Sequence, residues 1–171
     1  MIPIFAVQSQ YSNEADINRL IDLYSQPLTR LCYLYLKDYQ LAQEAVQDIL
    51  YKAYTKYSSF GRKSSEKTWI TKIAMNVCKD YLRRPACREF VSSETVQLAA
   101  QREDSPYTDG SSVELLHMVY TLPIVYKEVI LLRYYQDLSV NEISKILHEK
   151  PNTISVRLKR ARELLKVGLE E

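Results

Sequence analysis

The stretch LSVNEISKILHEKPNTISVRLKRAR, residues 138–162, decides the fold of the C-terminal part of the chain. Ser139 stands three residues before Glu142, which is the spacing of a capping box. In that motif the serine oxygen accepts an early helix N–H and the glutamate accepts the N–H of the serine. The apolar residues that follow keep helical spacing and predict a helix over residues 140–147.

A turn and a second helix complete this motif. Residues 148–151 (HEKP) interrupt the periodicity, and Asn152 is a candidate N-cap for a helix over residues 152–167. Two short helices joined by a tight turn are typical of a helix-turn-helix, whose second helix enters the major groove of DNA. Helical hairpins with basic faces also serve as protein interfaces. The expected buried side is Ile154, Leu158, Ala161 and Leu165; the residues left outside it are Thr153, Ser155, Val156, Arg157, Lys159 and Arg160.

Apolar residues at three- and four-residue spacing predict helices in the rest of the chain as well. One stripe extends from Ile17 to Tyr35 behind a candidate N-cap at Ser12 or Asn13, and Pro27 is expected to kink or divide this helix. Further helices are predicted over residues 40–57, 65–84, 112–120 and 123–136. The fold class is therefore all-α, with four helices in the C-terminal part.

The charges lie in blocks that mark two domains. Residues 49–88 carry ten basic and two acidic side chains, whereas residues 89–114 carry one basic and six acidic side chains and lose the apolar periodicity. We expect two small helical domains, residues 1–88 and 113–171, joined by a flexible acidic linker over residues 89–112. Basic stretches in both domains favour polyanion binding, although a basic helix face is as often only solvated.

Composition excludes several classes of function. Three glycines in 171 residues cannot supply a glycine-rich phosphate loop. The three cysteines form no CxxC pair and the two histidines lie far apart, so we expect no metal, no cofactor and a reduced cytoplasmic compartment. Residues 1–7 are apolar but too short for a signal peptide, and no stretch reaches the roughly 18 apolar residues of a membrane span.

Residues 52–84 interleave cations with aromatic side chains. Aromatic faces stack on unpaired bases while Lys and Arg follow the phosphates, so the pattern favours single-stranded DNA. Trp69 and Tyr81 also fit the apolar stripe of their helix, and a place in the core is the more common role for each. The aromatic residues in and beside this segment are Tyr51, Tyr54, Tyr57, Phe60, Trp69 and Tyr81.

Catalytic chemistry has little support in the sequence. Glu44 and Asp48 lie four residues apart on one helix face, as paired catalytic carboxylates can. No His or Cys accompanies them, and an acidic patch that faces solvent or a partner explains them better. His117 and His148 have no neighbouring acid and nucleophile.

Two sets of short motifs run through the two halves. The first set comprises residues 23–31 (LY…LTRL), 42–54 (AQEAVQD…KAY) and 69–84 (WITKIAMN…DYLRR). The second comprises residues 122–134 (LP…VILLRY), 138–147 (LS…EI…L) and 153–162 (TI…RLKRAR). In this order, with an acidic linker between them, they resemble the extracytoplasmic-function sigma factors of bacterial RNA polymerase.

The resemblance implies a role for three groups of residues. At the −10 promoter element it implies Asn76 and Asp80, with Lys79, Arg83 and Arg84 as phosphate contacts; we assign Lys56, Tyr57, Phe60 and Trp69 to the same element from the pattern of cations and aromatic rings. At the −35 element it implies Ser155, Val156, Lys159 and Arg160; Thr153 and Arg157 are assigned there because they lie outside the buried side of the same helix. For docking on the clamp helices of the largest polymerase subunit it implies Glu44, Gln47 and Asp48.

The same resemblance implies a non-catalytic initiation factor that binds core polymerase, recognises and helps to melt promoter DNA, and is held inactive by an anti-sigma factor. The second domain is expected on the flap of the second-largest subunit. Two alternatives stay open: a helix-turn-helix regulator that binds duplex DNA without polymerase, and an interaction protein that only sequesters a partner. An enzyme acting on nucleic acid has the least support.

Overall fold

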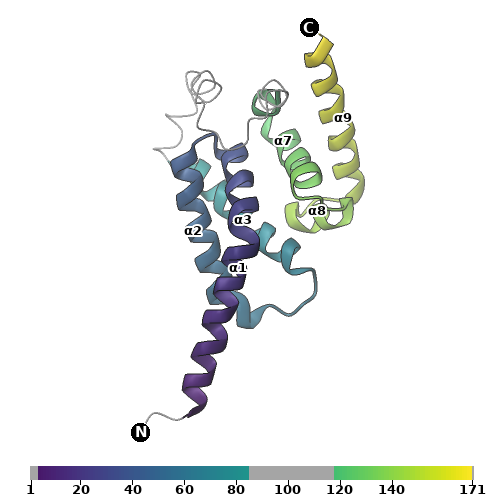
Figure 1. The fold of residues 1–171 in the computed structure, drawn as a ribbon. Coiled ribbons are helices and arrows are strands. Elements are labelled where there is room, and N and C mark those ends of the chain that lie inside the picture. Colours follow the sequence, from purple (N-terminus) through teal and green to yellow (C-terminus); the bar gives the residue numbers. More distant parts are fainter. Residues whose placement is uncertain (1–3, 85–117, 171) are drawn as a thin grey trace.

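A computed structural model of the chain describes residues 4–84 and 118–170 (Figure 1). These residues form helices joined by short connections and contain no strand, which confirms the all-α class. The predicted linker (residues 89–112), Cys87 and His117 lie outside the described residues.

The N-terminal domain contains α1 (Ile4–Leu36), α2 (Tyr39–Lys56), the short 3-10 helix η1 (Tyr57–Ser59) and α3 (Glu66–Arg83). Asp38 caps α2 by accepting the N–H of Leu41 at 2.9 Å, and Ser65 caps α3 by accepting the N–H of Thr68 at 3.1 Å. These two caps place α2 and α3 within one residue of the predicted boundaries.

The first helix differs from its prediction in three respects. It begins at Ile4, so neither Ser12 nor Asn13 is its N-cap, and Pro27 does not divide it into two helices. A proline removes one helical hydrogen bond, but Leu28 and Leu31 are buried on the turn that follows, and this packing holds the helix together. Ile21, expected on the inner stripe, is 40% exposed.

The described part of the C-terminal domain starts at residue 118, and residues 118–121 are helical; they include the part of the helix predicted over residues 112–120 that lies within the described residues. Next comes α7 (Ile124–Ile130), which continues directly into the π-helix η2 (Leu131–Tyr135). Residues 123–136, predicted to form a single helix, therefore contain an α-helix followed directly by a π-helix. The change is visible in the hydrogen bond from the N–H of Gln136 to the carbonyl of Leu131, five residues back, at 3.1 Å.

The helix-turn-helix consists of α8 (Val140–Leu147) and α9 (Pro151–Glu170). Both halves of the predicted capping box between Ser139 and Glu142 are present. His148 ends α8 in the left-handed conformation (φ 57°). The last helix begins at Pro151, so Asn152 lies inside its first turn and is not the cap; proline suits that position because its missing N–H has no helical acceptor there.

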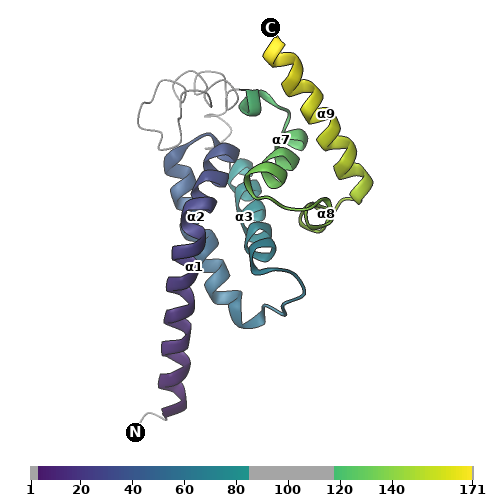
Figure 2. The same cartoon turned by 45° about the vertical axis from the view of Figure 1, so that its right-hand side comes forward.

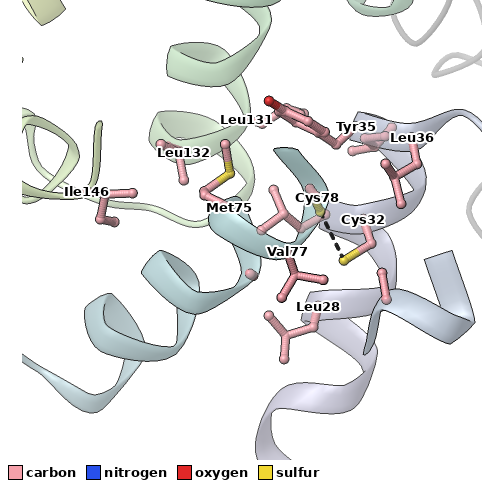
Figure 3. Close-up of a cluster of buried hydrophobic side chains, with 14 of the residues drawn as sticks. Leu28, Cys32, Tyr35, Leu36, Met75, Val77, Cys78, Leu131, Leu132 and Ile146 are labelled. Atoms are coloured by element: carbon pink, nitrogen blue, oxygen red, sulfur yellow. Dashed lines mark hydrogen bonds between the residues drawn. The ribbon is translucent and has the colours of Figure 1, made fainter. Parts of the chain in front are cut away.

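The two domains pack against each other. Figures 1 and 2 show α7 and α8 beside α3, and contacts join α3 to α8 and α1 to η2. Figure 3 shows Met75 of α3 beside Leu132 of η2, and both side chains are buried. Deeper in the N-terminal domain, the sulfur atoms of Cys32 and Cys78 lie 3.6 Å apart and both residues are fully buried, as small apolar side chains.

Candidate nucleic-acid and polymerase interfaces

The outer face of α9 carries the residues predicted for the −35 element. Ile154, Leu158 and Ala161 are buried, as predicted, so the side chains between them face away from the domain. Figures 1 and 2 both show α9 on the side of the C-terminal domain that is remote from α1 and α2. The exposed members of the predicted set are Ser155, Val156, Lys159 and Arg160.

The other two members of that set are half-buried. Thr153 lies in the first turn of α9. The Nη2 atom of Arg157 donates to Oε1 of Glu149, in the turn before α9, at 2.7 Å. This ion pair fixes α9 to the turn, so the guanidinium of Arg157 already has a protein partner.

On α3, Asn76, Asp80 and Arg83 are exposed and follow one another at four- and three-residue spacing, so they share one face. Nη1 of Arg83 lies 3.4 Å from Oδ1 of Asp80. Three of the predicted −10 residues of α3 thus form an exposed polar row.

Lys79 lies at the edge of this row, three residues after Asn76 and four before Arg83, and its side chain contacts the C-terminal domain. Its Nζ atom is 3.2 Å from Oε1 of Glu128 on α7, and the same oxygen accepts the hydroxyl of Tyr35 at 2.7 Å. Burial, and next the charge of Glu128, raises the pKa of Tyr35, so its hydroxyl stays a donor. Among the predicted −10 residues, Lys79 is thus engaged by the other domain.

A second polar contact joins the domains near the start of α3. The hydroxyl of Thr68, which is 4% exposed, donates to Oε1 of Glu142 at 2.7 Å. The other oxygen of Glu142 accepts the N–H of Ser139 at 2.9 Å. These hydrogen bonds, that of Thr68 first, lower the pKa of Glu142. The capping residue of the helix-turn-helix is therefore also a link to the N-terminal domain.

The predicted docking residues lie on α2, where Glu44 and Gln47 are exposed. Asp48 is half-buried and accepts the hydroxyl of Tyr81 at 2.8 Å. Burial and this hydrogen bond raise the pKa of Tyr81 to about 12, and the guanidinium of Arg84 lies 3.8 Å from the centre of its ring. Asp48 therefore has a structural partner in addition to its predicted role.

Sequence reasoning missed one exposed residue of this α2 face. Tyr51 is 69% exposed and stands three residues after Asp48, one helical turn further on. Its aromatic character placed it with the candidate base-stacking residues, but its helical position places it beside Glu44 and Gln47. The spacing of residues 44, 47, 48 and 51 along one helix face is the signal that could have found it.

The aromatic residues predicted for the −10 strand gather at the loop between η1 and α3. The rings of Phe60 and Trp69 stack with their centroids 4.8 Å apart, and Tyr57 meets Trp69 edge-on at 6.0 Å. All three are half-buried, whereas Lys56 is exposed. The alternative prediction, that Trp69 and Tyr81 are core residues, holds for only one of them. Tyr81 is 3% exposed and belongs to the core, whereas Trp69 is half-buried and packs against it.

Arg19 of α1 and Glu66 of α3 join this loop. The two guanidinium Nη atoms donate to the two carboxylate oxygens at 2.9 and 2.6 Å, and Tyr57 donates its hydroxyl to Glu66 at 2.6 Å. The bond from Arg19 is the main reason that the pKa of Glu66 falls to about 2. Neither Arg19 nor Glu66 belongs to the predicted sites, because residues 47 positions apart give no local signal of pairing.

Among the described residues, no group of three or more His, Cys, Asp and Glu side chains is placed to hold a metal ion. None of the helices in that part of the chain is both long and apolar enough to span a membrane.

Comparison with known proteins assigns both halves of the chain. Residues 20–86 match the family described as Sigma-70 region 2, and residues 112–165 match Sigma-70, region 4. RNA polymerase sigma factor SigV of Bacillus subtilis (strain 168) is 30% identical over 146 residues, which cover 85% of this chain and 86% of SigV. The extracytoplasmic-function (ECF) sigma factor SigW of the same organism is 27% identical over 164 residues, 89% of this chain and 88% of SigW.

Solved structures share the fold. The sigma factor RpoE of Bartonella quintana, determined with the anti-sigma factor NepR, superposes with a TM-score of 0.74 at 23% identity, over 91% of this chain and 97% of RpoE. CnrH, determined with the cytosolic domain of CnrY, superposes with a TM-score of 0.68 at 21% identity, over 98% of this chain and 96% of CnrH. The chain belongs to the ECF group of the sigma-70 family of RNA polymerase sigma factors.

Proposed function

We propose that this sigma factor binds core RNA polymerase through α2, reads the −35 element with α9 and binds the −10 element with α3 and the loop before it. The observation that carries the proposal is the outer face of α9, where Lys159 and Arg160 stand exposed on a helix whose opposite side is buried. In a helix-turn-helix this is the face that meets the major groove. The protein contributes no catalysis of its own and acts in the cytoplasm, where the polymerase works.

Within this scheme the −35 contacts divide by chemistry. Ser155 and Val156 are short and exposed near the start of α9, where they reach base edges by a hydroxyl and by a methyl group that fits thymine. Lys159 and Arg160 lie one turn further on and neutralise phosphates. Thr153 supports the first turn, and Arg157 positions α9 through Glu149.

The −10 element is assigned to two groups. Asn76, Asp80 and Arg83 form the exposed polar row of α3, and Arg84 adds a cation at its end. Lys56, Tyr57, Phe60 and Trp69 surround the loop, where cations and aromatic rings together suit an unpaired strand.

The polymerase-binding surface is assigned to Glu44, Gln47 and Asp48, with Tyr51 added from its place on the same helix face. An exposed aromatic ring is typical of a protein interface, and the carboxylates beside it repel the phosphates of DNA. The partner is the clamp-helix region of the largest subunit, and the C-terminal domain binds the flap of the second-largest subunit.

We place the domain boundaries at residues 1–88 and 113–171, with residues 89–112 as the linker. The bond between Lys79 and Glu128 gives the two domains a packed arrangement that must open before Lys79 can contact DNA. An anti-sigma factor that favours the packed arrangement would keep the protein inactive; the structural neighbour RpoE was determined in complex with an anti-sigma factor, NepR.

Run-off transcription with purified core polymerase on a library of bacterial promoter fragments tests the function. We expect discrete transcripts that depend on added protein. Lys159→Ala with Arg160→Ala should weaken promoter binding and lower the slope of log K against log salt by about 2, since each lost phosphate contact removes about 1. Lys166→Ala, an exposed cation later in α9, is the matched control and should leave the affinity near that of the wild type. An unchanged slope in the double variant contradicts the phosphate role.

A further inference from the structure

Three side chains from three elements form a polar network at the base of the loop that precedes α3, and Tyr24 of α1 lies beside Glu66 in the same cluster. Arg19 of α1 binds both carboxylate oxygens of Glu66, the first residue of α3, and its Nη2 also donates to the hydroxyl oxygen of Tyr57 at 2.6 Å. Tyr57 in turn donates to Glu66 at 2.6 Å. Each of the three groups therefore contacts the other two. Glu66 is the more shielded member, with 19% of its side chain exposed against 41% for Arg19.

This network fixes both ends of the loop. Tyr57 begins η1, before the loop, and Glu66 begins α3, after it, so their hydrogen bond joins the two ends across nine residues. The loop between them, residues 60–65, extends away from the helices below α2 and α3 (Figure 2). At its start Phe60 stacks on Trp69 of α3.

The backbone of the loop is one that needs such support. Arg62 has φ 51°, in the left-handed region that a residue with a Cβ atom disfavours. Such conformations persist where the surrounding structure determines them. Here the determinants are the Phe60–Trp69 stack and the Arg19–Glu66–Tyr57 network, since residues 61–63 are themselves exposed.

The exposed part of the loop has the chemistry of a polyanion ligand. Arg62 and Lys63 are exposed, as is Lys56 before the loop, and within the described residues none of these three side chains has a protein partner. Lys79 and Arg157, by contrast, are held by carboxylates. Unpaired cations beside a stacked aromatic pair suit the phosphates and bases of a single strand. A loop already held in its binding conformation loses less conformational entropy when it binds.

We propose that Arg19, Glu66 and Tyr57 hold residues 60–65 in the conformation that binds the unpaired −10 strand, which makes Arg19 and Glu66 positioning residues for −10 recognition. This inference rests on the proposed −10 role of the loop and deepens it. It also changes the part assigned to Tyr57, whose hydroxyl is committed to the network and whose main contribution is to loop geometry.

Trp69, the sole tryptophan of the chain, makes the loop measurable without DNA. Arg19→Met removes the guanidinium but keeps the apolar length of the side chain, and Tyr57→Phe removes one hydroxyl. Both variants should increase quenching of Trp69 fluorescence by acrylamide, because Phe60 covers its ring less well once the loop loosens. Lys166→Met removes one cation far from the loop and is the matched control. Melting temperature and helical content, recorded for each variant, verify the fold.

The second measurement uses the holoenzyme on the promoter found by run-off transcription and on templates with single −10 base changes. Arg19→Met should reduce the preference for the parent −10 sequence by about fivefold, the order expected when the ordering of a binding group loses the equivalent of one hydrogen bond of ordinary strength. Arg19→Lys, which keeps the charge but not the two-pronged geometry, should recover only part of it. A loss of overall stability does not change this ratio.

The outcomes separate the inference from the function beneath it. Unchanged Trp69 quenching in Arg19→Met overturns the network's role in the loop. A looser loop with unchanged −10 preference overturns the positioning role, if Arg62→Ala with Lys63→Ala still weakens −10 binding. If that loop variant also leaves −10 binding unchanged, the proposed function of the loop is wrong, and the positioning role falls with it.

Discussion

The bond between Lys79 and Glu128 predicts how firmly the two domains are held together. Glu128 is 7% exposed and accepts two contacts from the N-terminal domain, the ammonium of Lys79 and the hydroxyl of Tyr35. Lys79→Met removes the cation and leaves a buried carboxylate that still accepts the neutral hydroxyl of Tyr35. In the closed arrangement, in which the two domains pack as described above, the charge of Glu128 is then uncompensated. In an open arrangement, in which the domains are separated, Glu128 is hydrated.

The magnitude follows from the burial of the pair. Removing one partner of a fully buried ion pair costs about 3–5 kcal/mol, whereas an exposed pair contributes under about 1 kcal/mol. The Lys79 side chain is 35% exposed and that of Glu128 9%, so the pair lies between these limits. We therefore expect Lys79→Met to destabilise the closed arrangement by about 2 kcal/mol, which increases the ratio of open to closed molecules about 30-fold.

Single-molecule energy transfer between dyes at Gln43→Cys on α2 and Glu163→Cys on α9 measures this ratio, since both sites are exposed. Cys32 and Cys78 are buried, and a Cys87→Ser background avoids a third label. Lys79→Met should increase the low-transfer population, and the further change Glu128→Gln should reverse most of that increase. Identical distributions for wild type and Lys79→Met would refute the reasoning.

Three further predictions concern single side chains. Burial, and then Lys37, lowers the pKa of Lys127 from 10.5 to about 8, so below pH 8 the folded state bears the full cost of the charge. Lys127→Met should raise stability by about 3 kcal/mol at pH 7, and in chemical denaturation this gain should shrink as pH rises from 8 to 10.5. Glu66, with its pKa lowered from 4.5 to about 2, contributes stability above pH 4.5 that is lost as pH falls toward 2; the melting temperature of Glu66→Gln should therefore fall less than that of the wild type across this window. Asp48→Ala should cost about 1 kcal/mol by freeing the hydroxyl of Tyr81, and Tyr81→Phe with Asp48→Ala should cost no more than Asp48→Ala alone; a clearly larger loss in the double variant would contradict this pairing.

Local features of the fold could be predicted from the sequence. The spacing of Ser139 and Glu142 predicts the start of α8, and the interruption at residues 148–151 predicts the turn before α9. Both depend on hydrogen bonds between near neighbours, which a short sequence window contains. The apolar period likewise identifies Ile154 and Leu158 as the buried side of α9.

Features that depend on distant residues could not be predicted. Division of α1 at Pro27 was one of the two expected outcomes, but packing around Leu28 and Leu31 keeps the helix continuous. The contacts of Glu128 with Tyr35 and of Arg19 with Glu66 join residues 93 and 47 positions apart, and no local pattern marks them. For the same reason the sequence assigned Lys79 to the −10 element and Tyr57 to base contact without the partners that both have in the folded chain.

Run-off transcription tests the central claim most directly, because it requires polymerase binding, −35 recognition and −10 opening at once. Wild-type protein with core polymerase should give discrete start sites. With the Lys159→Ala and Arg160→Ala double variant, these transcripts should disappear from promoters with a −35 element. With Lys166→Ala they should remain. Transcription that does not depend on the added protein, or no detectable binding to core polymerase, would contradict the account and favour a helix-turn-helix regulator that acts without polymerase.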